Sequence, residues 1–68
     1  MKRFNKGDIV TIIDSTHLPL SYQKLLGEPL VFIRSTEDGY SIFKTPTGET
    51  RRCYTFRLEH YKLNLENE

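Results

Sequence analysis

The chain has 68 residues, which is enough for one small domain and leaves little core to support a deep catalytic cleft. Ten lysines and arginines stand against nine aspartates and glutamates, and this balance argues against a strong nucleic-acid binder, whose pI usually exceeds about 9. The single cysteine excludes an intramolecular disulfide and favours a reducing compartment, so we expect a cytoplasmic protein.

Neither a secretory signal nor a membrane span is expected. The basic N-terminus is not followed by the apolar region of a signal peptide, and no apolar run approaches the roughly 20 residues that cross a bilayer. We expect one domain over residues 1–68, with frayed ends at 1–3 and 64–68.

The first predicted strand lies within residues 4–14. A Lys6-Gly7-Asp8 turn precedes residues 9–13, which are β-branched throughout, as is typical of strands. The long connection that follows has apolar residues at helical spacing within 18–27, and it ends on a glycine with a proline just beyond. We therefore expect one or two helical turns, packed by Tyr22, Leu25 and Leu26.

Residues 28–58 predict three strands joined by two tight turns. The apolar run at 30–33 leads to Asp38-Gly39, a strong hairpin signal, and the run at 40–44 leads to a second turn at 45–49. A third strand is expected over 51–58, with a 3₁₀ turn around 54–56 and a last short strand over 58–63.

Five short strands with one long loop after the first predict an all-β fold, a small five-stranded SH3-like barrel with one short helical turn in that loop. An OB-fold is the alternative, although its strands are usually longer than this chain allows.

Two segments resemble the KOW type of SH3-like barrel. Lys6 to Ile13 is similar to the turn and strand that open that family's domain, and Lys24 to Val31 is similar to its segment leading into the second strand. The likeness covers roughly the first half. The chain departs from the family in the longer 14–23 connection and at Leu25, where the family has glycine. The resemblance implies binding to RNA or to proteins of the transcription and translation machinery.

The two turns leave the strand register open. If both are two-residue loops, Val31, Ile33, Tyr40 and Ile42 face the core, and the opposite face is a contact surface. If both are three-residue loops with a glycine bulge, Arg51 and Cys53 share a face with Phe43, in place of Arg52 and Tyr54. A sharply bent strand that buries both of its sides is a further alternative. The candidate partner-binding residues are Phe32, Arg34, Phe43, Arg51, Arg52 and Tyr54.

Catalytic and metal chemistry find little support in the sequence. Cys53 and His60 could form a nucleophile–base pair, but no third group is identifiable, and a lone cysteine in a strand is usually a small core residue. His17 together with these two residues lacks zinc-ligand spacing. We therefore do not expect an enzyme, and we expect no bound metal, cofactor or small-molecule substrate.

The sequence therefore predicts a binding module. The first hypothesis is an adaptor or inhibitor that acts on a protein partner, of the kind that phages and mobile elements encode. The alternative is RNA or DNA binding through the same face, because aromatic rings stack on bases and basic residues follow phosphates. The candidate phosphate contacts are Lys2, Arg3, Lys6 and Arg57.

Overall fold

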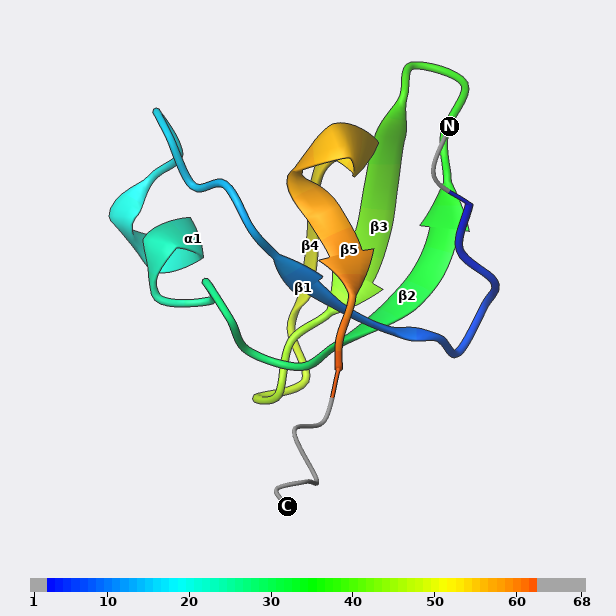
Figure 1. Cartoon of the computed structure of the whole chain (residues 1–68), viewed down its shortest axis with the longest axis horizontal. Helices are drawn as coiled ribbons and strands as arrows, with labels where there is room; N and C mark the ends of the chain where they lie inside the picture. The colour runs from blue at the N-terminus through cyan, green and yellow to red at the C-terminus, as the bar shows by residue number, and fades with distance from the viewer. Residues whose placement is uncertain (1–2, 63–68) are drawn as a thin grey trace.

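Five antiparallel strands form one sheet in the order β4-β3-β2-β1-β5 in the computed structural model, which describes residues 3–62 (Figure 1). The predicted all-β fold, with a short helical turn after the first strand, is confirmed. In chain order the elements are β1 (Ile9–Ile12), α1 (Leu20–Gln23), β2 (Leu30–Ser35), β3 (Tyr40–Lys44), β4 (Thr50–Tyr54), the 3₁₀ helix η1 (Thr55–Arg57) and β5 (Leu58–His60).

The sheet is strongly curved, so that its two ends face one another across a small core. In Figure 1, β1 and β5 cross in front of β3 and β4. Every strand contributes to the apolar cluster that fills the space between them, and Phe4, Tyr22 and Leu25 pack against its rim. The buried members are Val10, Ile12, Leu30, Phe32, Phe43, Cys53 and Leu58.

Several predicted boundaries were too generous. The first strand starts only at Ile9, because Gly7 has a φ of 92° and the Asp8 carboxylate accepts the Asn5 amide, which closes a turn. The third predicted strand is interrupted by η1 where a 3₁₀ turn was expected. Leu26 is 48% exposed, so its predicted packing role is wrong.

The chain ends were only partly testable. Strand β5 ends at His60, three residues before the predicted end at Leu63, which lies outside the described residues. Residues 1, 2 and 64–68, where fraying was expected, also lie outside them, and Arg3 is exposed.

Both hairpin turns are three-residue loops closed by a glycine with positive φ. In the first, the Gly39 amide donates to the Thr36 carbonyl, and the φ of Gly39 is 86°. In the second, the Gly48 amide donates to the Thr45 carbonyl, and the φ of Gly48 is 91°. The two-residue alternative is therefore wrong and the glycine-bulge alternative is confirmed.

A threonine stabilises each of these turns from its first position. The Thr36 hydroxyl accepts the Tyr40 amide at 3.2 Å, and the Thr45 hydroxyl accepts the Glu49 amide at 3.0 Å. These side chains supply acceptors to amides at the start of the returning strand, and this favours the longer loops.

The face of β2 and β3 that was predicted to be a contact surface is the core face. Phe32 pairs with Phe43, and both are buried, with 3% and 0% of their surface exposed. Cys53 shares their face, because it pairs with Ser41 next to them. Val31 is 41% exposed, so neither the predicted core face nor a strand buried on both sides is observed.

The opposite face of β3 and β4 is the outer face of the sheet. Register places Tyr40 opposite Tyr54, and Ile42 opposite Arg52. A bulge in β2 between Phe32 and Arg34 brings Arg34 opposite Ile42 as well. The candidate site is built on this face.

Candidate functional site

Three aromatic side chains stack in a row over β3, β4 and η1. The rings of Tyr40 and Tyr54 lie 4.4 Å apart at an interplanar angle of 30°, and those of Tyr54 and Phe56 lie 5.4 Å apart at 16°. Tyr54 is 42% exposed and Phe56 is 61% exposed. We call Tyr40, Tyr54 and Phe56 the aromatic ladder. Its rings lie outside the buried core cluster, so core packing does not explain it.

An arginine lies against each end of the aromatic ladder. The guanidinium carbon of Arg52 is 5.1 Å from the centre of the Tyr40 ring, and that of Arg57 is 5.4 Å from the centre of the Phe56 ring. These distances suit cation–π attraction. A hydrogen bond with the Tyr54 side chain, together with desolvation, raises the pKa of Tyr40, so the Tyr40 phenol is neutral near pH 7.

The two arginines differ in how firmly they are held. Arg57 donates to the backbone carbonyl of Asp14 at 3.0 Å and lies 3.8 Å from its carboxylate, and only 14% of its side chain is exposed. Arg52 is exposed. Arg57 therefore ties η1 to the loop after β1, whereas Arg52 can meet a ligand.

A groove runs beside the aromatic ladder. It has a cavity volume of about 330 Å³ and separates Tyr40 and Tyr54 from the loop that carries His17 to Pro19 and from Tyr22 of α1. Arg52 and Arg57 also line it, and none of the lining residues within 3–62 is an aspartate or glutamate. The groove thus has aromatic and aliphatic walls and cationic edges.

The structure divides the six predicted partner-binding residues. Phe32 and Phe43 belong to the core, so the prediction that they form a contact surface is wrong; the bulge in β2 keeps them opposite one another, and the curved sheet closes over their face. Arg51 is on the core side of β4, and its guanidinium reaches out to the Glu49 carboxylate at 2.7 Å. The remaining three, Arg34, Arg52 and Tyr54, share the outer face.

Two residues of the site were not predicted. Tyr40 was assigned to the core, and Phe56 was placed in a turn without a role. A three-residue second loop places residue 40 opposite residue 54. Knowledge of the loop length would therefore have put Tyr40 on the same face as Tyr54. Phe56 could not be placed without the geometry of η1.

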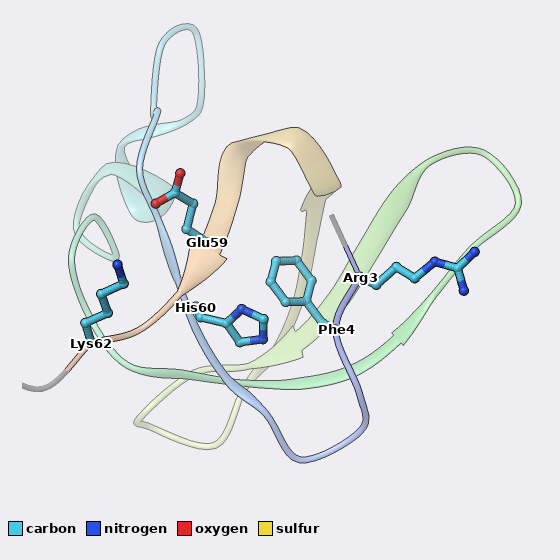
Figure 2. Close-up of a pocket in the computed structure, with 5 residues that line it drawn as sticks. All are labelled: Arg3, Phe4, Glu59, His60 and Lys62. Carbon is cyan, nitrogen blue, oxygen red and sulfur yellow. The ribbon is translucent and has the colours of Figure 1, made fainter. Parts of the chain in front are cut away.

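The three candidate phosphate contacts within residues 3–62 do not form a common site. Arg3 and Lys6 are exposed near the N-terminus, Arg57 is engaged with Asp14, and Lys2 lies outside the described residues. A shallow cavity of about 260 Å³ is lined by Arg3, Phe4, Glu59, His60 and Lys62. Figure 2 shows the Phe4 and His60 rings beside one another, whereas the Arg3 side chain extends away from them. These charges do not converge on one anion.

The residues considered for catalysis are explained by structural contacts. Burial raises the pKa of the Cys53 thiol to about 11, so it is not an activated nucleophile. His60 lies 3.2 Å from the Asp8 carboxylate and packs edge-on against Phe4. Within residues 3–62, no group of three or more histidines, cysteines, aspartates and glutamates is placed to hold a metal ion.

Comparisons of the chain with protein-family models, curated proteins and solved structures gave no match. None of the helices in residues 3–62 is long and apolar enough to cross a membrane.

Proposed function

We propose that this chain is a non-enzymatic binding module, an adaptor or inhibitor that docks a protein partner through the aromatic ladder and Arg52. The observation that carries the proposal is the row of three stacked aromatic rings outside the core, of which Tyr54 and Phe56 are exposed and Tyr40 is half-buried. Aromatic residues and arginine are enriched among the residues that supply most of the binding energy at protein interfaces. A cytoplasmic setting belongs to the same proposal, since the buried Cys53 is a free thiol.

A protein partner fits this surface better than single-stranded nucleic acid. A base stacks on an open ring face, but Tyr54 has a ring neighbour in both Tyr40 and Phe56. Of the predicted basic contacts, Arg51 is paired with Glu49 and Arg57 with Asp14. The surface therefore offers ring edges and phenol hydroxyls more than stacking platforms and unpaired cations.

The test is affinity capture of binding proteins from cell lysate, carried out with and without nuclease. The proposal predicts a stoichiometric protein band that survives nuclease. Phe56→Ala and Arg52→Ala should each weaken the captured complex at least about tenfold, which is the loss expected for an interface residue of central importance.

The matched control is Ile9→Ala. Ile9 is 41% exposed on β1, away from the aromatic ladder, so this variant removes exposed apolar surface without touching the site. Equal loss in Ile9→Ala and Phe56→Ala would contradict the assignment of the surface. Recovery of RNA or DNA alone would replace it with the nucleic-acid alternative.

A further inference from the structure

Strand β4 is an open edge of the sheet, and its outward backbone groups can be identified from the register. The Thr45 amide bonds to Glu49 and the Thr55 amide bonds to Gly39, so the hydrogen-bonded pairs between them are 43 with 51 and 41 with 53. The intervening residues of β4 point their amides and carbonyls away from β3. These residues are Thr50, Arg52 and Tyr54.

A weak contact with α1 covers the middle of this edge. The outward amide of Arg52 donates to the Tyr22 hydroxyl at 3.4 Å, which is longer than the usual 2.7–3.2 Å of such bonds. Thr50 and Tyr54 flank it on either side. The Thr50 carbonyl accepts a hydrogen bond from the Arg51 guanidinium at 3.2 Å, and the Tyr54 carbonyl accepts one from the Cys53 thiol at 3.5 Å. The Thr50 and Tyr54 amides and the Arg52 carbonyl are the outward groups that remain for an added strand.

Grooves lie on both sides of Tyr22 along β4. The one beside the aromatic ladder is described above, and a second of about 280 Å³ is lined by Tyr22, Ile42, Thr50, Arg51 and Arg52. Tyr22 and Arg52 line both, so the two grooves adjoin at the contact between the Arg52 amide and the Tyr22 hydroxyl. None of the described residues that line the two grooves is acidic, and three of them are arginines. Arg51 is paired with Glu49 and Arg57 with Asp14, so the exposed Arg52 is the arginine that can meet an acidic segment.

We propose that the partner adds an extended, acidic segment to the edge of β4 as a sixth strand. This inference rests on the proposed function, because it assumes that the partner is a protein. Main-chain hydrogen bonds to Thr50, Arg52 and Tyr54 provide the affinity, and a carboxylate beside Arg52 provides the selectivity. A carbonyl of the added strand replaces the Tyr22 hydroxyl at the Arg52 amide.

Charge argues against a second copy of this chain as the added strand. Antiparallel pairing of two β4 strands about their centre would place Arg52 directly opposite Arg52. Like charges in directly opposed positions destabilise a strand pair. An acidic segment meets the same arginine with the opposite sign.

The probe is a capped hexapeptide of alternating glutamate and valine, titrated into the unmodified protein and followed by the hydrogen exchange of individual amides. Binding should slow exchange at Thr50, Arg52 and Tyr54, whereas the amides of Arg51 and Cys53 already bond to β3. A peptide with lysine in place of glutamate should bind at least about tenfold more weakly. Equal binding of both peptides, no binding of the acidic peptide, or binding without protection of the three amides would overturn the proposal.

Backbone methylation of the peptide separates strand addition from side-chain docking. Successive amides of a strand point to opposite edges, so N-methylation of either the valines or the glutamates blocks one edge only. At least one of these two peptides should lose binding. If both keep the affinity of the parent peptide, main-chain pairing is excluded.

Tyr22→Phe provides the matched variant on the protein. It keeps the ring and removes the hydroxyl that competes for the Arg52 amide, so peptide affinity should rise about two- to tenfold, the range of one ordinary hydrogen bond. Unchanged or reduced affinity would contradict the exchange of partners at Arg52. The peptide titration does not depend on the lysate experiment. If the Phe56→Ala variant captured the protein partner as well as the parent chain does, the aromatic ladder would be rejected as the docking surface. The peptides would still decide whether a strand adds to β4.

Discussion

The hydroxyl of Ser41, which is completely buried on β3, lies 2.6 Å from that of Thr55 at the start of η1. This bond fixes the 3₁₀ helix against the sheet, and the next residue of that helix is Phe56. The aromatic ladder therefore depends on a polar contact beneath it as well as on the stacking of its rings.

Loss of this contact should destabilise the fold. Ser41→Ala should lower the free energy of unfolding by about 1–2 kcal/mol, because Thr55 loses its partner in a partly buried position. The loss of unfolding free energy is measured by urea unfolding of Ser41→Ala, Thr55→Val and the double variant. The double variant should lose less than the sum of the two single losses, and simple additivity would show that the hydroxyls do not interact.

Two phenylalanines should respond in opposite ways to truncation. Phe43→Ala should cost about 3–5 kcal/mol of unfolding free energy, because the ring is fully buried. Phe56→Ala should cost less than about 1.5 kcal/mol, since it loses mainly a surface ring contact. Thermal and urea unfolding compare them, and similar losses would contradict the assignment of faces.

The second hairpin turn requires a left-handed residue at Gly48. An added Cβ would meet no atom within 4 Å, so the cost of Gly48→Ala is backbone strain alone, about 1–2 kcal/mol at a φ of 91°. Gly48→Asn should lose less, because asparagine tolerates this conformation. Equal unfolding free energies for the alanine variant and the parent chain would argue against the glycine bulge.

Cys53 should react slowly with alkylating reagents in the folded protein. Burial raises the pKa of its thiol from 9.0 to about 11, which alone lowers the thiolate fraction about hundredfold near pH 8. The measurement compares the rate of iodoacetamide labelling in buffer and in denaturant. A folded-state rate close to that of the denatured chain would show that the thiol is accessible.

Stability should fall in acid partly through Asp8. Its hydrogen bond from the Asn5 amide, and then its contact with His60, lower the pKa of Asp8 below 3.8. As the pH falls, the unfolded chain therefore binds a proton at Asp8 before the folded chain does. The stabilisation of the fold by Asp8 is complete above about pH 3.8 and is lost as the pH falls through the lower folded-state pKa. Asp8→Asn should flatten the decline of urea stability below that pH.

The control for this titration is Glu37→Gln, an exposed carboxylate in the first hairpin turn. It removes one negative charge from an exposed turn, as Asp8→Asn also does, and so separates the loss of a charge from the loss of the Asp8 contacts. An Asp8→Asn profile that declines as steeply as that of Glu37→Gln would contradict the role given to Asp8.

The sequence by itself determined the elements. β-branched and aromatic runs separated by Gly-containing turns gave five short strands, and helical spacing closed by Gly27 and Pro29 gave the single turn of α1. These signals are local, since each depends on residues within a few positions of one another. The pattern of threonine, two residues and glycine occurs at both Thr36–Gly39 and Thr45–Gly48. It is compatible with the three-residue loops that the structure has, although the two-residue loop was also open from the sequence.

Only the tertiary structure decided which residues face outward. The three-residue loop between β3 and β4 places Tyr40 opposite Tyr54 and puts Cys53 on the face of Phe43, and a bulge in β2 keeps Phe32 opposite Phe43. The curvature of the sheet then makes the face of Phe32 and Phe43 the core. The aromatic ladder brings together residues 40, 54 and 56, and the Tyr22 hydroxyl meets the Arg52 amide at the edge of β4. Such contacts are fixed by the curvature of the whole sheet and by how the loop after β1 folds back, and neither is encoded in any short stretch of the chain.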